Sequence, residues 1–267
     1  MLLKSVIVYL YIMNSTQHLT YNIKNNIPCI FAKYGDGEFT AATFRSGHNC
    51  DGTPLTNKLG NAVRESIQYI SKQPNSMIGK WNTSDVYTFW QSLVNQPINY
   101  VDYHTVINDT NCIDNSDKLD LLRSIKESNR KKIYIANPLL KKAKLLLNVD
   151  VHIEVDYSNW FETDYENVRD AVCNSIETDS NTIIMTSAGI GAKPLISDLH
   201  KLYPNAIYID MGSSLDTICT KRDSRGCTPS YDALYQYFKP IIPSDWESEY
   251  YTLLYDTARR ILGKHLH

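Results

Sequence analysis

The sequence lacks the features that mark nucleic-acid-binding, membrane-spanning and disulfide-stabilised proteins. Its 27 Lys and Arg against 29 Asp and Glu give a net charge of -2, so no basic field predicts nucleic-acid binding. The apolar stretch over residues 2–13 is too short to span a bilayer. The 6 cysteines include no C-x-x-C pair, which supports neither a zinc site nor a disulfide framework. These absences predict a cytoplasmic protein in a reducing compartment, with no transmembrane segment.

Glycine is sparse, with 11 residues, and no repeat, low-complexity tract or long linker interrupts the chain. A chain of 267 residues with 43% apolar content can bury the core of one large α/β domain or two small ones. We expect a single domain over residues 27–267, preceded by an amino-terminal extension over residues 1–26. The apolar start of that extension is interpreted as a first strand or as sequence upstream of an internal start at Met13.

Apolar runs alternate with amphipathic stretches along the chain. The runs predict strands over residues 29–32, 76–79, 99–101, 132–136, 151–155, 182–186 and 206–210. The stretches predict helices over residues 38–45, 55–72, 84–95, 118–129, 139–147, 164–176, 192–202 and 245–262. Strands separated by helices of this length indicate an α/β fold with a Rossmann-like, mainly parallel sheet flanked by helices.

The segment Lys33-Tyr34-Gly35-Asp36-Gly37-Glu38 directly follows the first predicted strand. Carboxylates spaced i and i+2 on extended or turn backbone project to the same side, so Asp36 and Glu38 are expected to converge on a cation or a sugar hydroxyl. Gly35 and Gly37 carry no Cβ and allow a ligand to approach the backbone closely. The alternative is a solvated acidic turn that caps the following helix.

A second candidate segment joins the strand at 182–186 to the helix at 192–202. Gly189 and Gly191 open this helix, where backbone N–H groups favour phosphate, and Lys193 adds a positive charge. The pattern is not a full G-x-G-x-x-G, so a tight turn without a ligand is the alternative.

The next strand ends at Asp210, an acid suited to ribose hydroxyls. Ser213, Ser214 and Asp216 follow with two hydroxyls and a second acid, although Ser213 and Asp216 also suit helix caps. Arg225 then supplies a guanidinium that can grip a diphosphate with two hydrogen bonds. The alternative for the segment that contains Arg225 is a solvated loop.

In order and spacing these segments resemble the GT-D class of glycosyltransferases over roughly residues 27–240. That family carries an Arg-x-Gly-Asp-Gly-Glu signature, a strand–Gly-x-Gly–helix segment and an Asp-x-Gly-Ser-x-x-Asp stretch. The matching residues are Gly35-Asp36-Gly37-Glu38, then Gly189, Gly191 and Lys193, then Asp210-Met211-Gly212-Ser213-Ser214-Leu215-Asp216. Lys33 departs from the pattern because it stands where the family has Arg, which keeps the charge and loses the planar fork.

The resemblance implies a GT-D-type fold and an enzyme that moves a sugar from a nucleotide-diphosphate donor to a hydroxyl of a glycan or glycoprotein. Asp36 and Glu38 would be the acidic centre, either catalytic or holding Mn²⁺ or Mg²⁺. The residues implied in donor binding are Lys33, Gly35, Gly37, Gly189, Gly191, Lys193, Asp210, Ser213, Ser214, Asp216 and Arg225. The alternatives are a metal-dependent nucleotide or sugar-phosphate hydrolase and a non-catalytic nucleotide- or carbohydrate-binding module.

If a metal occupies the Asp36/Glu38 pair, the base that accepts the hydroxyl proton must come from elsewhere. His104 and His152 are the candidates, each with a structural alternative as a hydrogen-bonded histidine.

Aromatic residues near strand ends are candidates for a platform under the acceptor sugar, with core packing as their alternative. They are Trp81, Trp90, Trp160 and Phe161.

Overall fold

The computed structural model describes residues 13–80, 84–102, 116–156, 158–222 and 229–248. Its strands are β1 (Cys29–Tyr34), β2 (Ser76–Lys80), β3 (Tyr100–Asp102), β4 (Lys131–Ala136), β5 (Val151–Glu154), β6 (Thr182–Ser187) and β7 (Ile207–Asp210). Its α-helices are α2 (Ser15–Lys24), α3 (Asp36–Ala42), α4 (Asn57–Ile70), α5 (Ser84–Ser92), α7 (Ser116–Glu127), α8 (Ala143–Leu147), α9 (Trp160–Thr163), α10 (Tyr165–Ser175), α11 (Ala192–Leu202), α12 (Asp216–Thr220) and α13 (Tyr231–Phe238). Two 3₁₀ turns, η2 (Pro138–Leu140) and η3 (Asp179–Asn181), complete the described elements. The expectations for residues 1–12 and most of the predicted final helix lie outside the described residues.

The strands form a 7-stranded sheet in the order β3-β2-β1-β7-β6-β4-β5, and every neighbouring pair is parallel. The predicted Rossmann-like parallel sheet is therefore confirmed, and each predicted strand lies within two residues of its observed bounds. From β1 the chain builds β2 and β3 toward one edge, then crosses to β4 on the other side. The strand order thus reverses beside β1, which is where open α/β sheets form their binding crevices.

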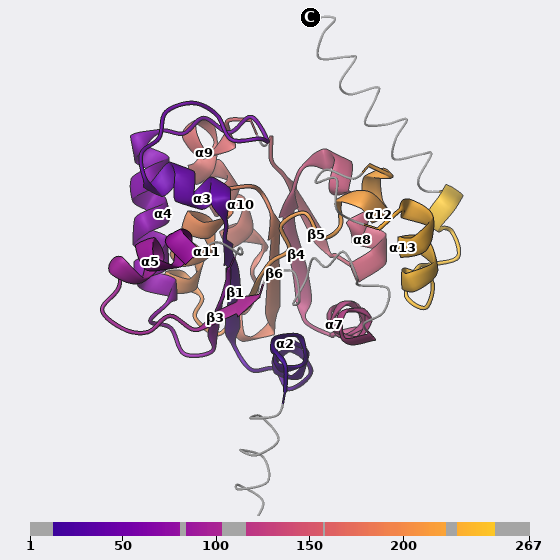
Figure 1. Ribbon diagram of the computed structural model, residues 1–267. Helices are drawn as coiled ribbons and strands as arrows, with labels where there is room; N and C mark the ends of the chain where they lie inside the picture. Colours follow the sequence, from indigo (N-terminus) through magenta and orange to yellow (C-terminus); the bar gives the residue numbers. More distant parts are fainter. Residues whose placement is uncertain (1–12, 81–83, 103–115, 157, 223–228, 249–267) are drawn as a thin grey trace, which may run out of the picture.

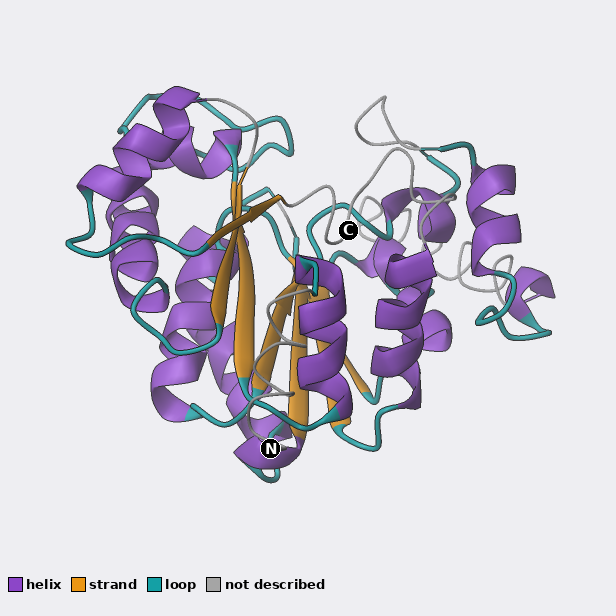
Figure 2. Cartoon of the chain, turned by 60° about the horizontal axis from the view of Figure 1, so that its bottom comes forward, coloured by secondary structure: helices purple, strands orange, loops and turns teal. Residues whose placement is uncertain are grey.

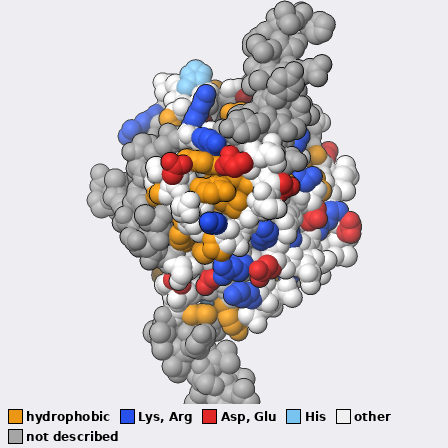
Figure 3. Space-filling model, turned by 90° about the vertical axis from the view of Figure 1, so that its right-hand side faces the viewer, with side chains coloured by type: hydrophobic (Ala, Val, Ile, Leu, Met, Phe, Trp, Pro, Cys, Tyr) orange, Lys and Arg blue, Asp and Glu red, His pale blue; other side chains and the backbone are white. Residues whose placement is uncertain are grey.

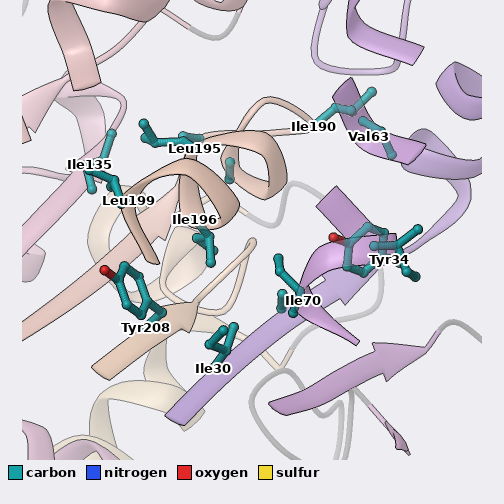
Figure 4. Close-up of a cluster of buried hydrophobic side chains, with 14 of the residues drawn as sticks. Ile30, Tyr34, Val63, Ile70, Ile135, Ile190, Leu195, Ile196, Leu199 and Tyr208 are labelled. Carbon is teal, nitrogen blue, oxygen red and sulfur yellow. The ribbon is translucent and has the colours of Figure 1, made fainter. Parts of the chain in front are cut away.

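Helices cover both faces of the sheet (Figures 1 and 2), and a separate apolar core lies under each layer. β1 shows how one strand serves both cores, because successive side chains point to opposite faces. Ile30, Ala32 and Tyr34 face the layer of α4 and α11 (Figure 4), whereas Cys29 and Phe31 face the layer of α2 and α7. Strands buried on both faces are continuously apolar, which is why the sequence predicted them so closely.

Helix α2 lies within the predicted amino-terminal extension and packs against α7. Asn14 caps it by accepting a hydrogen bond from the Gln17 backbone N–H, at 2.9 Å. Leu19 and Ile23 enter the core beneath it, fully or almost fully buried.

Three helix predictions illustrate how local residues set the boundaries. The prediction for α11 matches its observed bounds. The helix predicted over residues 139–147 is instead divided into η2 and α8, since Pro138 starts a separate short turn that Asn137 caps. Helix α3 begins at Asp36, two residues before its predicted start at Glu38.

The face shown in Figure 3 carries both acidic and basic side chains around apolar ones, in keeping with the near-neutral net charge. In the described part of the chain, no helix has the length and apolar character needed to cross a bilayer.

Candidate active site

The candidate site lies at the carboxyl edge of the three central strands. β1, β7 and β6 are adjacent in the sheet, and each one ends in one of the three segments that the sequence singled out. A pocket of about 260 Å³ opens between these segments. Nine predicted residues line it together: Lys33, Asp36, Gly37, Glu38, Gly189, Lys193, Asp210, Ser213 and Asp216. The three segments therefore belong to one site, at the point where the strand order reverses.

A buried lysine holds the centre of this site. Lys193 Nζ lies 2.7 Å from Glu38 Oε1 and 2.9 Å from Asp210 Oδ2, and it donates to the Gly189 carbonyl oxygen at 3.2 Å. The side chains of Lys193, Glu38 and Asp210 are 3%, 4% and 1% exposed. Because an ammonium has three N–H donors, Lys193 has none left for a phosphate. A contact between Lys193 and the donor would have to break one of these bonds.

Lys193, Glu38 and Asp210 form a buried triad, and the attraction between opposite charges shifts the pKa values of Glu38 and Lys193. Burial by itself raises the pKa of Glu38, but the nearby ammonium groups of Lys193 and then Lys33 lower that pKa to about 2. Burial by itself lowers the pKa of Lys193, yet the carboxylates of Asp210 and Glu38 raise that pKa above its ordinary value. Glu38 and Lys193 are therefore both ionised at neutral pH.

The two buried carboxylates also fix the backbone around the pocket. Glu38 Oε2 accepts a hydrogen bond from the Gly35 N–H at 2.7 Å. Asp210 accepts from the Lys33 N–H at 3.1 Å and, through its other oxygen, from the Gly212 N–H at 3.1 Å. The acids thereby tie the ends of β1 and β7 to the start of α11. Their oxygens are engaged with protein donors, which leaves them poorly suited as metal ligands.

Asp36 differs from Glu38 in its burial and in its contacts. The expectation of extended or turn backbone is wrong, because Asp36 is the first residue of α3, but both carboxylates line the same pocket. Residues two apart on a helix point roughly 200° apart about its axis. Glu38 thus turns into the interior, whereas Asp36 is exposed at the pocket. Within the described residues its carboxylate has no hydrogen-bond or ion-pair partner.

Among the described residues, three predicted donor-binding residues do not line the pocket. Gly35 lies under the Lys33 side chain, and a Cβ there would be 2.8 Å from Lys33 Cε. The Ser214 hydroxyl is buried, and Ser214 is not among the residues that line the pocket. Gly191 lies against Trp160, and Arg225 is outside the described residues. The donor-binding roles of these residues stay predictions.

The sequence analysis missed a pocket wall formed by the loop between α3 and α4. Asn49, Cys50 and Asp51 line the pocket from this loop. The Asn49 side chain lies against Gly37, and Asp51 Oδ2 would be 2.8 Å from a Cβ at Gly189, whose φ is +64°. The turn residues Asp51-Gly52-Thr53-Pro54 marked a loop here, but its contact with two distant glycines is a tertiary feature. Ser187, Ile190 and Gly212 complete the unpredicted lining.

Close packing against two aromatic side chains accounts for the glycine at position 191. A Cβ at this position would lie 2.7 Å from Trp160 Cζ2 and 3.2 Å from Phe161 Cδ2. We therefore expect Gly191→Ala to lower the free energy of unfolding by about 1–3 kcal/mol, the usual effect of overpacking. Urea unfolding measures this loss, and calorimetric titration with a nucleoside diphosphate serves as the control. A large loss of nucleotide affinity at unchanged stability would contradict the packing role.

The candidate base His152 does not line the pocket. His152 is on the edge strand β5 against the Tyr134 ring, and burial lowers its pKa to about 4, so it is a neutral structural histidine. His104 lies outside the described residues.

The predicted aromatic platform is wrong for three of its residues. Trp90, Trp160 and Phe161 are 1%, 4% and 4% exposed and pack in the core. Trp81 lies outside the described residues.

The charges around the pocket are predominantly negative. Five carboxylates and two lysines line it, for a formal net charge of -3. Among the residues that the structure describes, no group of three or more His, Cys, Asp or Glu is placed to hold a metal ion. Mg²⁺ is commonly held by one or two carboxylates together with substrate phosphates rather than by a cage of protein ligands. Asp36, with a free carboxylate, fits such a shared site, whereas Glu38 does not.

The parallel sheet and the pocket at its strand reversal define an α/β protein with a crevice at the carboxyl edge of the central strands. Two solved structures have this fold. One is a selenomethionine-substituted structure of domain of unknown function 1792, with a TM-score of 0.53 at 15% identity, covering 88% of this chain and 92% of its own. The other, described as the highly conserved domain of unknown function 1792 with a distinct glycosyltransferase fold, has a TM-score of 0.55 at 16% identity and the same coverage of 88% and 92%. The chain therefore has the glycosyltransferase fold described for that domain. No family model and no curated protein matches the sequence.

Proposed function

We propose that the protein is a glycosyltransferase that moves a sugar from a nucleotide-diphosphate donor to a hydroxyl of a glycan or glycoprotein. The observation that carries the proposal is the free carboxylate of Asp36 at a pocket where three central strands end. A transferase needs such a group, because the acceptor hydroxyl must lose its proton as it attacks. The glycosyltransferase fold of the structural neighbours supports the same class.

In the proposed reaction the acceptor oxygen forms a bond to the anomeric carbon while the bond from that carbon to the diphosphate oxygen breaks. Asp36 accepts the hydroxyl proton, and the nucleoside diphosphate leaves with the bonding electron pair. Lys33 and the backbone at Gly189 lie where they can contact the diphosphate, and Ser213 and Asp216 offer polar groups to the nucleoside. Lys193 acts by positioning Glu38, Asp210 and the Gly189 turn.

The negative pocket favours a donor that arrives with a divalent cation. A diphosphate adds negative charge to a pocket whose lining already carries -3. Mn²⁺ or Mg²⁺ bound to the diphosphate would offset this repulsion and stabilise the leaving group. Asp36 would be its protein ligand, or else the base, since one carboxylate does not do both at once.

Calorimetric titration with UDP, GDP, ADP and CDP, each with and without Mn²⁺, tests the proposal. We expect one nucleotide to bind with Mn²⁺ and to bind at least roughly tenfold more weakly without it, because each 1.4 kcal/mol of lost attraction weakens affinity tenfold. Incubation of the matching nucleotide sugar with and without glycan acceptors then separates transfer from hydrolysis. Failure of all four nucleotides to bind in the presence of Mn²⁺ would exclude the proposed donor class. Release of free sugar at the same rate without an acceptor would instead identify a hydrolase.

A further inference from the structure

A cluster of aromatic and arginine side chains lies at the surface beside α3. The Phe39 and Phe89 rings are 5.2 Å apart at 87°, and Arg64 Cζ lies 4.7 Å from the Phe44 ring centre and 5.5 Å from that of Phe89. Arg45 Cζ lies 5.6 Å from the Phe39 ring centre. We call these five residues the aromatic–arginine surface. It joins three elements, namely α3 with its following turn, α4 and α5.

Phe44 is held at this surface in an unfavourable state. Its side chain is 42% exposed, and its φ of +57° lies in the left-handed region, which is disfavoured for a bulky residue. Gly60, inside α4, makes room for it, because a Cβ there would lie 2.9 Å from the Phe44 ring. A Cβ at Gly60 would also lie 2.5 Å from the Ala41 carbonyl oxygen, so this glycine serves helix packing as well. The left-handed backbone follows from the end of α3, where the Phe44 N–H donates to the Ala41 carbonyl oxygen and the Arg45 N–H donates to the Thr40 carbonyl oxygen in a Schellman motif. The exposed ring is therefore the part of Phe44 that a ligand can contact.

The arginines in this cluster have hydrogen-bond donors to spare. Arg64 Nε donates to the Ala42 carbonyl oxygen at 2.8 Å, which fixes the guanidinium between the Phe44 and Phe89 rings. In the described part of the chain, no carboxylate pairs with Arg64 or Arg45. The surface thus offers the exposed Phe44 ring together with unused N–H donors. This combination suits a sugar ring, whose C–H face packs on an aromatic ring while its hydroxyls accept hydrogen bonds from a planar fork of donors.

Helix α3 connects this surface to the candidate active site. Asp36 and Phe39 are three residues apart on α3, and residues at this spacing are neighbours on one helix face, about 5–6 Å apart at Cβ. Phe39 therefore lies about one helical turn from the Asp36 carboxylate. Phe89 contacts Phe39, and Arg64 in turn contacts Phe89.

We propose that the aromatic–arginine surface is an acceptor subsite that binds the sugar rings of a glycan chain whose reacting hydroxyl lies at Asp36. The inference rests on the proposed function for the role of the glycan as acceptor. The binding of the glycan is testable without turnover.

The experiment measures glycan binding to the full chain by saturation-transfer NMR with cellotetraose, maltotetraose and chitotetraose as probes. Phe44→Asn is the main variant, because asparagine tolerates the left-handed conformation and removes only the ring. Arg64→Gln removes the guanidinium. We expect at least one probe to bind the wild type and each variant to bind it roughly 3- to 10-fold more weakly, the range of a lost aromatic contact. Leu202→Asn, which changes a 58%-exposed leucine on α11, should leave binding unchanged.

Three outcomes would overturn the proposal. They are failure of all three probes to bind the wild type, binding by both variants equal to that of the wild type, and loss of self-association in Phe44→Asn, which would assign the surface to a second copy of the chain. Nucleoside-diphosphate binding is measured in the same samples and should be equal in all variants. If the wild type binds a glycan but no nucleotide, the proposed function fails and the glycan site stands. If transfer occurs, the variants should raise KM for the acceptor and leave kcat unchanged.

Discussion

Replacement of Lys193 by Met is expected to reduce the free energy of unfolding by about 3–5 kcal/mol, because it leaves two buried carboxylates without their cation. Glu38 and Asp210 both lie within 3 Å of the ammonium and are almost fully buried. For chains of this size the change corresponds to a fall in melting temperature on the order of 10 °C. Chemical denaturation and calorimetry measure both quantities.

The matched control is Lys201→Met, the same substitution on the same helix. Lys201 Nζ pairs with Asp198 at 2.9 Å, but the two side chains are 49% and 38% exposed. Exposed pairs contribute about 0–1 kcal/mol, so this variant should stay close to the wild type. Equal effects of the two substitutions would show that the buried triad is not what stabilises the site.

The effect of Lys193→Met should depend on pH in a defined direction. The pKa of Glu38 is lowered to about 2 in the folded protein, below about 4.3 in the unfolded chain, so its contribution is full above the unfolded value and is lost as pH falls toward 2. Without Lys193 that pKa rises, and protonation then relieves the buried charge. The stability difference between wild type and variant should therefore be largest near pH 7 and smaller near pH 4. A difference that is constant over this range would contradict the electrostatic cause.

Much of the fold follows directly from local sequence. The central strands are apolar on both faces, as β1 shows by feeding Ile30 to one core and Phe31 to the other. The three candidate ligand-binding segments each follow a predicted strand. Because the carboxyl ends of parallel strands lie at one edge of the sheet, the sequence predicts that the three segments lie at the same edge. The order of the strands could not be predicted, because the local sequence does not specify which strands become neighbours.

The parts of the site that escaped prediction depend on distant contacts. Lys193 was interpreted as a phosphate ligand, because the sequence does not reveal that Glu38 and Asp210 surround it. The start of α3 had a local signal, since Glu38 stands three residues after Gly35 and accepts its N–H, the pattern of a capping interaction. The same pattern separates the roles of the two acids, because the third residue of the helix is turned inward and the first is left free.

The different positions of Asp36 and Glu38 predict opposite effects of their substitution on activity and stability. Asp36→Asn should reduce the rate of sugar transfer by about 10²–10⁴-fold, the contribution of a general base. The unfolding free energy should fall by less than about 1 kcal/mol, since the change removes only a favourable charge at the start of α3. Glu38→Gln should show the opposite balance, with a clear loss of stability, because Lys193 then keeps a single carboxylate partner. Transfer assays and thermal melting of the two variants measure this contrast.

Titration with Mn²⁺ then distinguishes the two roles open to Asp36. If Asp36 is the base, the variant binds nucleoside diphosphate and Mn²⁺ as the wild type does, and only its transfer rate falls. If Asp36 is the metal ligand, the Mn²⁺ concentration needed for nucleotide binding rises. Asp232→Asn, on the exposed side of α13, controls for the loss of one negative charge and should change neither quantity. Wild-type transfer by Asp36→Asn would remove Asp36 from the reaction and leave it only the role of a favourable charge at the start of α3.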